Sequence, residues 1–226
     1  SFISTEMLKA GVDLRLNADV ANITQTPSDT KNIGPLSVRL ADGTMLEVDA
    51  VLYATGRVPN VKGIGLEALG VAQKTDGAIQ VNTHYQTSVP NIYAVGDVTA
   101  RVQLTPVALG EAMVVVDHLL GPVAGKAPCA MSYDFIPTAV FTHPNIGTVG
   151  FSEVDARAQF GNIRVYKSEF KALKHTLSGS MERSFMKLLV DDASDRVVGL
   201  HMVGAEAGEI VQGFAVAMKA GATKAV

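Results

Sequence analysis

The chain has 226 residues, of which 47% are hydrophobic and 18% are charged, and its formal net charge is −3. This composition supports a packed core in one or two domains. Because the chain carries no basic surplus, we expect no nucleic-acid partner. No apolar run reaches the ~20 residues of a membrane span and no signal peptide opens the chain, so we expect no membrane partner.

The chain contains a single cysteine, Cys129, which follows the Gly/Pro-rich stretch 121–128. One cysteine excludes an internal disulfide and suits a reducing compartment, so we predict a cytoplasmic location. A lone cysteine in such a stretch is more simply incidental than catalytic. The stretch itself is the best candidate for a linker, because it separates two patterned regions.

The first patterned region predicts one helix and several strands. Ser1–Val12 has apolar residues at helical spacing, and Gly11 suits its C-cap. A hairpin turning at Asp42-Gly43 is predicted because alternating segments flank this turn signal. The predicted strands of this region are Val12–Ile23, Leu36–Leu40, Met45–Val48 and Asp49–Ala54.

The centre of the chain is organised around a strand, a turn and a helix. Asn91–Val95 is mostly apolar and reads as a buried strand of a parallel-type sheet, ending at Gly96-Asp97. A helix is predicted over Leu104–Leu120, with Thr105 as N-cap and its apolar residues mostly in the core. Ligands bind at the carboxyl edge of such sheets. The Asp97 carboxylate and the N-terminus of the predicted helix would both be available to a ligand at this edge. An ordinary strand–turn–helix with a solvated Asp97 is the alternative.

The last 90 residues change to an antiparallel pattern. Ser152 is predicted to cap a helix whose first turn is acidic, and an amphipathic helix is predicted at the end of the chain. Strands with helices beside them make an α+β unit. The predicted elements are strands over Pro137–Thr142, Ile146–Phe151, Ile163–Phe170, Phe185–Val190 and Arg196–Val203, and the helix Ala205–Ala220.

Several strings in these regions resemble one family. They are A-T-G-R-V-P-N from Ala54, N-I-Y-A-V-G-D with L-T-P-V-A from Asn91, I-P-T-A-V-F-T-H-P-N-I-G-T-V-G from Ile136, and V-V-G-L-H-M-V-G from Val197. Together they resemble the FAD-dependent pyridine nucleotide-disulfide oxidoreductases, and within that family the glutathione reductases. The resemblance covers essentially the whole chain in the family's order.

The resemblance implies the fold class and the domain plan. It implies α/β and α+β architecture: remnants of two nucleotide-binding, Rossmann-like domains, followed by an α+β interface domain that joins two subunits. The predicted domains are the C-terminal half of an NAD(P)-binding domain over 1–56, the C-terminal part of an FAD-binding domain over 57–130, and the interface domain over 131–226. The implied partner is a second copy of the chain, bound through 131–226.

The resemblance also implies roles for individual residues. Asp97 would bind the ribityl chain of FAD, and Thr105 would lie beside the pyrimidine end of the flavin. Gly96 and Gln103 belong to the same cofactor-binding stretch. Because it has no side chain, Gly56 would allow close approach of the nicotinamide cofactor, NADPH. Arg57 pairs either with a phosphate or with a nearby carboxylate.

Two further residues concern the nicotinamide and the substrate. The backbone at Ala139 would touch the carboxamide of the nicotinamide. Met113 occupies a position where several glutathione reductases carry an arginine facing the disulfide substrate, and the alternative is a buried methionine in an apolar helix. This departure weakens the choice of glutathione disulfide over another disulfide.

The catalytic groups of the family are not found in these 226 residues. There is no G-x-G-x-x-G loop, no cysteine pair and no H-P-T-x-x-E motif. Three histidines, His84, His118 and His175, show no partner pattern, and His143 lies in a turn and is read as structural. His201, in a strand, is not the catalytic base, and we predict no metal site. We therefore expect a fragment of an NADPH- and FAD-dependent reductase of glutathione disulfide, inactive alone. The alternatives are a non-enzymatic dimerisation module, or a reductase for a trypanothione-like or dihydrolipoamide-like disulfide.

Overall fold

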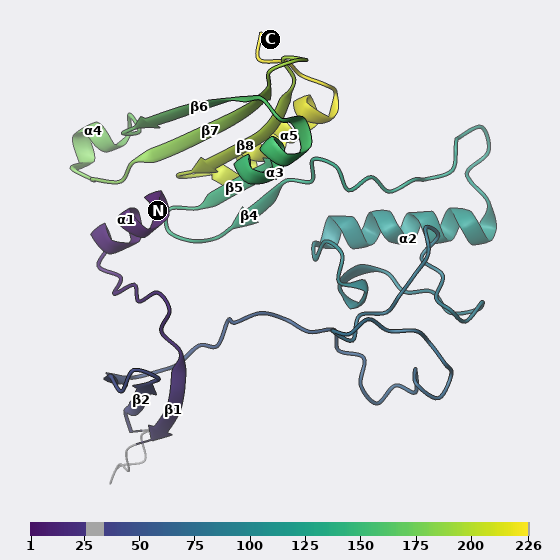
Figure 1. Ribbon diagram of the computed structural model, residues 1–226, viewed down its shortest axis with the longest axis horizontal. Helices are drawn as coiled ribbons and strands as arrows, with labels where there is room; N and C mark the ends of the chain where they lie inside the picture. The colour runs from purple at the N-terminus through teal and green to yellow at the C-terminus, as the bar shows by residue number, and fades with distance from the viewer. Residues whose placement is uncertain (26–33, 226) are drawn as a thin grey trace. The chain divides into compact units, whose positions relative to one another are not determined.

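The computed structural model describes residues 1–25 and 34–225 (Figure 1). The chain forms two compact units, one made of residues 1–50 and 134–226 and the other of residues 51–133. The predicted domain boundaries at 56/57 and 130/131 stay predictions.

The first unit opens with helix α1 (Phe2–Lys9), whose N-cap Ser1 accepts a hydrogen bond from the Ser4 N–H. The helix ends at the C-cap Ala10, one residue before the predicted Gly11. α1 packs on the C-terminal part of its own unit, because the rings of Phe2 and Phe185 stack with centroids 5.2 Å apart.

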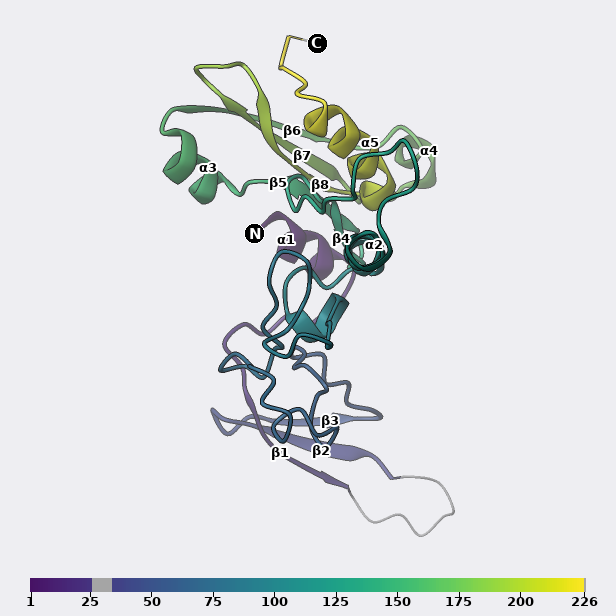
Figure 2. The same cartoon turned by 90° about the vertical axis from the view of Figure 1, so that its right-hand side faces the viewer.

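Three strands of the first unit form a small antiparallel sheet in the order β1-β2-β3, labelled in Figure 2. They are β1 (Val20–Gln25), β2 (Leu36–Leu40) and β3 (Met45–Val48). The predicted hairpin is confirmed, and the carboxylate of Asp42 accepts a hydrogen bond from the Thr44 N–H at 2.9 Å to close its turn. The strand predicted from Val12 begins only at Val20.

The remaining strands of the first unit form a five-stranded antiparallel sheet, β4-β5-β8-β7-β6. Helices α3 (Glu153–Phe160) and α5 (Ala207–Lys219) cover its opposite faces, because they pack against separate core clusters. The predicted strands here are confirmed, and so is Ser152 as the cap of α3. The elements are β4 (Thr138–Val140), β5 (Ile146–Gly150), β6 (Ile163–Phe170), β7 (Ser184–Asp191), β8 (Val197–Val203) and the short α4 (His175–Ser178).

The second unit contains a 3-10 turn, η1 (Gly96–Thr99), and the 16-residue helix α2 (Thr105–Leu120). The prediction of Thr105 as N-cap was wrong by one residue. Leu104 is the cap, because it is extended and its carbonyl accepts hydrogen bonds from the N–H groups of Val107 and Ala108. The predicted core face of α2 was also largely wrong: Val107 is buried, but its other members are exposed, namely Leu109, Met113, Val116, Leu119 and Leu120.

Two predicted buried strands, Asp49–Ala54 and Asn91–Val95, are not strands in the structure. A strand is defined by pairing with a neighbour. Among the described residues, Asn91–Val95 makes a single bridge, from Tyr93 to Gln86, and its remaining hydrogen bonds are those of turns. The segment is nevertheless partly buried, because Ala94 lies in the core cluster of this unit.

Candidate flavin-binding turn

The site is centred on the turn Gly96-Asp97 in the second unit. Gly96 has φ +73°, and a Cβ at this position would lie 3.1 Å from the Cβ of Ala108 on α2. Glycine is therefore required both by the left-handed backbone and by the close approach of the helix. The turn follows the segment 91–95 and presents the side chain of Asp97 with 46% of its surface exposed.

Arg57 lies beside Asp97, with Nη2 3.3 Å from Oδ2. Of the two partners that the sequence left open for Arg57, the structure contains the carboxylate. The arginine side chain is 72% exposed, so this ion pair contributes little to stability and is readily exchanged for another partner. Gly56 precedes it with φ +123°, a backbone conformation that strongly favours glycine.

A buried carboxyl group behind the turn was missed by the sequence analysis. Glu111, on α2, is 1% exposed, and its Oε2 accepts a hydrogen bond from the Gly96 N–H at 2.6 Å. Its other oxygen, Oε1, accepts from the Tyr133 hydroxyl, also at 2.6 Å. The available signal was a single glutamate within an otherwise apolar helical segment, because a buried carboxyl group needs polar partners.

Tyr133 joins Glu111 to two further side chains. Its hydroxyl lies 2.8 Å from the Tyr85 hydroxyl and accepts a hydrogen bond from Nη1 of Arg101 at 3.1 Å. The Arg101 guanidinium lies over both rings, at 5.1 Å from the centroid of Tyr85 and 5.8 Å from that of Tyr133. Burial, together with donation to Glu111, raises the pKa of Tyr133 well above its ordinary value, so the phenol stays protonated.

The structure places the other predicted site residues as follows. Gln103 and Thr105 are exposed at the start of α2, in the same unit as the Gly96-Asp97 turn. Met113 is exposed on α2, so the buried-methionine reading is not supported by the described residues. Ala139 belongs to the other unit, where it pairs with Gly147 in β4 and β5.

This arrangement suits a ligand that carries hydroxyl groups. An exposed carboxylate accepts hydrogen bonds from hydroxyls, and Asp97 is held on a turn whose backbone is fixed. The N-terminus of α2 begins eight residues after Asp97 and carries the partial positive charge of a 16-residue helix. An electron-rich or anionic part of the same ligand is favoured near that end.

His201, which the sequence analysis set aside as a catalytic base, lies in β8 with Nε2 3.0 Å from the carbonyl oxygen of Phe151. Burial lowers the pKa of this histidine. In residues 1–25 and 34–225, no three His, Cys, Asp or Glu side chains gather in a group suited to a metal ion. Within the same ranges, no helix combines the length and apolar character needed to cross a lipid bilayer.

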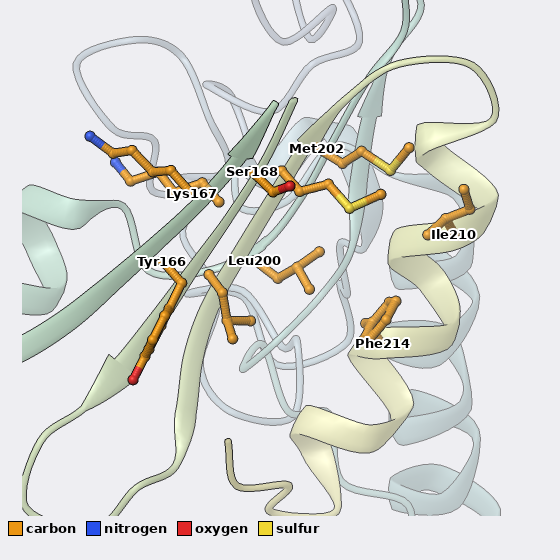
Figure 3. Close-up of a pocket in the computed structure, with 10 residues that line it drawn as sticks. Tyr166, Lys167, Ser168, Leu200, Met202, Ile210 and Phe214 are labelled. Carbon is orange, nitrogen blue, oxygen red and sulfur yellow. The ribbon is translucent and has the colours of Figure 1, made fainter. Parts of the chain in front are cut away.

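The first unit carries an apolar groove of about 270 Å³ on the α5 face of its larger sheet (Figure 3). Figure 3 shows Phe214 and Ile210 of α5 on one side, with Leu200 and Met202 of β8 and Tyr166 of β6 on the sheet side. Phe214 is 50% exposed, which is unusual for so large an apolar side chain.

Two family models match the chain. The model described as "Pyridine nucleotide-disulphide oxidoreductase" matches residues 1–112, and its dimerisation domain matches residues 136–226. The described fold is also similar to a solved flavoprotein disulfide reductase, HOCl-induced RclA from Escherichia coli, with a TM-score of 0.82 and 30% identity over 97% of this chain and 48% of that one. The predicted fold class, remnants of nucleotide-binding domains with a dimerisation domain, is confirmed.

Curated relatives include glutathione reductases and a trypanothione reductase. The glutathione reductase of Burkholderia cepacia is 46% identical over 99% of this chain and 47% of its own length. The chloroplastic/mitochondrial glutathione reductase of Pisum sativum is 47% identical over 85% of this chain and 34% of its own length. The trypanothione reductase of Trypanosoma congolense is 37% identical over 96% of this chain and 42% of its own length. The chain thus spans about half the length, or less, of these relatives.

Proposed function

Because the chain belongs to the pyridine nucleotide-disulphide oxidoreductase family, we propose that it is part of an NADPH- and FAD-dependent enzyme that reduces glutathione disulfide to glutathione. The observation that carries the proposal is the exposed Asp97 carboxylate on a turn that is fixed from behind by Glu111. When bound, FAD would pass electrons from NADPH to a pair of thiols, which reduce the disulfide.

The residues around the turn fit the flavin in chemistry. Asp97 accepts hydrogen bonds from ribityl hydroxyls, and the missing side chain of Gly96 leaves room for α2 to approach the turn. Thr105 and Gln103, exposed at the start of α2, are proposed to line the pyrimidine end. Their part is to bind and orient the flavin, while the helix N-terminus stabilises negative charge that develops there.

The proposed nicotinamide contacts lie at three residues. Gly56 would admit the cofactor, and Arg57 would exchange Asp97 for a phosphate as its partner, which its weak, exposed ion pair permits. Ala139, in β4, would offer backbone groups to the carboxamide.

The disulfide substrate is proposed to be glutathione disulfide, because the glutathione reductases of Burkholderia cepacia and Pisum sativum are 46–47% identical and the trypanothione reductase is 37% identical. Met113 is proposed to face the substrate, and it is exposed on α2. A methionine at this position removes a cation that would pair with a glutathione carboxylate, so a trypanothione-like disulfide is the second candidate.

The partner is proposed to be a second copy of the chain, bound through residues 131–226. A family dimerisation domain matches residues 136–226, and the apolar groove beside α5 lies in that region. A cytoplasmic location rests on the lone Cys129 and stays a prediction, since one relative is a chloroplastic/mitochondrial enzyme.

The experiment uses the full-length protein and the isolated 226-residue chain in parallel. The full-length protein is expected to show a flavin absorption band and to oxidise NADPH when glutathione disulfide is supplied, faster than with NADH or with trypanothione disulfide. The isolated chain is expected to show no such turnover, because one cysteine cannot form a dithiol pair. A colourless full-length protein without NADPH oxidation would contradict the proposed function. Turnover by the isolated chain would contradict its inactivity.

A further inference from the structure

We infer that Glu111 is a positioning residue for Asp97, setting the direction in which this carboxylate is presented to the flavin. The inference rests on the proposed function, because it concerns the same cofactor-binding turn. Glu111 does not itself reach the exposed side of the turn, since it is 1% exposed.

The backbone of Gly96 is held from both of its polar groups. Its N–H donates to Oε2 of Glu111 at 2.6 Å, and its carbonyl accepts from the Thr99 hydroxyl at 2.8 Å. Asp97 is the next residue, so the orientation of its Cα–Cβ bond follows from the orientation of Gly96. Glycine has no Cβ and can adopt many backbone conformations. These two hydrogen bonds therefore hold Gly96 at its observed φ of +73°.

The carboxyl group of Glu111 is in turn fixed at its second oxygen. The hydroxyl of Tyr133 donates to Oε1 at 2.6 Å and is itself held by Arg101 and Tyr85. Each member of this network restricts the next, so the carboxyl group is anchored at both oxygens. The network therefore provides a rigid reference, formed by α2 and the segment that follows it, against which the turn is set.

The competing explanation is that Glu111 only stabilises the fold of the second unit. The two explanations differ in how the effects of Glu111 and Asp97 combine. If Glu111 acts through Asp97, its loss is harmless to flavin binding once the Asp97 carboxylate has gone. If Glu111 only stabilises the fold, its loss leaves the dissociation constant of the folded protein unchanged, and if it affects FAD binding independently of Asp97, the two losses multiply in the dissociation constant.

The experiment measures the FAD dissociation constant of the full-length protein after its flavin has been removed, by quenching of flavin fluorescence. Asp97→Asn and Glu111→Met are made singly and together, and Glu67→Gln, an exposed carboxylate of the same unit, is the matched control. Each single variant is expected to weaken FAD binding about tenfold, and the double variant no more than about twofold beyond Asp97→Asn. Glu67→Gln is expected to leave the constant unchanged.

Two conservative variants cover the case in which Glu111→Met does not fold. Glu111→Gln can still accept from the Gly96 N–H while its amide donates to Tyr133, so it should bind FAD within about threefold of the parent. Tyr133→Phe frees one oxygen of Glu111 and should weaken binding a few-fold, an effect that should disappear in the Asp97→Asn background.

The outcomes separate the two proposals. If Asp97→Asn binds FAD as tightly as the parent, the proposed flavin site itself is wrong. Two other outcomes leave the flavin site standing but overturn the positioning role of Glu111. In the first, Asp97→Asn weakens FAD binding and the Glu111 or Tyr133 variants weaken it further by their full single-variant factor. In the second, Asp97→Asn weakens FAD binding and the Glu111 and Tyr133 variants leave it unchanged.

Discussion

Gly147 of β5 and Ala207 of α5 approach so closely that a side chain on Gly147 would overlap the helix. A Cβ built on Gly147 would lie 2.8 Å from the carbonyl carbon of Ala207 and 2.8 Å from Cγ2 of Val211. Both neighbours are fully buried in the core between the sheet and α5. The contact therefore fixes how near α5 lies to the larger sheet.

Replacing Gly147 by alanine is expected to destabilise the first unit by about 1–3 kcal/mol, because the helix must shift away from the sheet. The measurement is the free energy of unfolding in urea. Gly213→Ala on α5 is the matched control, since nothing lies within 4 Å of a Cβ there. This control should be neutral or stabilise by about 0.5–1 kcal/mol, as alanine does inside a helix. A Gly147→Ala protein as stable as the parent would show that α5 is not closely packed here.

The ion pairs of Glu153 predict a dependence of stability on pH. This carboxylate lies 2.7 Å from Nζ of Lys187 and 2.9 Å from Nη2 of Arg157, and chiefly the hydrogen bond from Lys187 lowers the pKa of Glu153 to about 2. Since the pKa is depressed in the folded state, the stabilisation is complete above the ordinary value near 4.5 and is lost as pH falls towards 2.

Glu153→Gln should therefore unfold at a lower urea concentration than the parent at pH 7, and the difference should shrink as pH falls from about 5 to 3. Urea midpoints at a series of pH values provide the measurement. Lys187→Gln removes the partner that lowers the pKa of Glu153 most. The difference in urea midpoint between the parent and this variant should therefore also shrink as pH falls from about 5 to 3. A difference between parent and Glu153→Gln that is constant across this range would refute the assignment.

Parts of the fold were predictable because their signals are local. The alternation within Ile163–Phe170 and the Ser152 cap require only neighbouring residues, and both were confirmed. Asn91–Val95 was assigned wrongly, because apolar residues show burial but not the presence of a strand to pair with. Glu111 was missed for a related reason, since its bond to Gly96 joins residues 15 positions apart and exists only once α2 has packed.

Burial of His201 predicts a second pH effect, at higher pH. Burial is the main cause that lowers the pKa of this imidazole, with Lys187 nearby adding to it. The folded state therefore favours neutral His201, while the unfolded chain takes up a proton near pH 6.5. Stability is then lost as pH falls below about 6.5. His201 is a base and Glu153 is an acid, but both have a lowered pKa in the folded state, so both make the protein less stable at lower pH.

His201→Gln should remove this loss, because glutamine does not titrate and its amide can still donate to the Phe151 carbonyl. The thermal midpoints of parent and variant, compared from pH 7.5 to 5.5, test this expectation. Parent and variant should converge, or cross in favour of the variant, towards the acidic end. Curves that stay parallel would mean that His201 takes up its proton equally in both states.

The exposed aromatic ring of Phe214 provides a test of the proposed homodimer. It lines the apolar groove of the first unit and is 50% exposed, and Ile210, which lines the same groove one turn earlier on α5, is 38% exposed. If a second copy of the chain covers this face, Phe214→Asp places a charge in an apolar interface without disturbing the core of the unit. Sedimentation of the full-length protein should then change from dimer to monomer, with the dissociation constant raised at least about a hundredfold.

The matched control is Leu177→Asp, an equally drastic change on α4 at a side chain that is 99% exposed. This variant should sediment as the parent does. Retention of a parent-like dimer by Phe214→Asp would place the subunit contact away from α5, even if the family's dimerisation domain is used. A parent protein that is monomeric at micromolar concentration would overturn the homodimer itself, and the exposed apolar face of α5 would then require another partner.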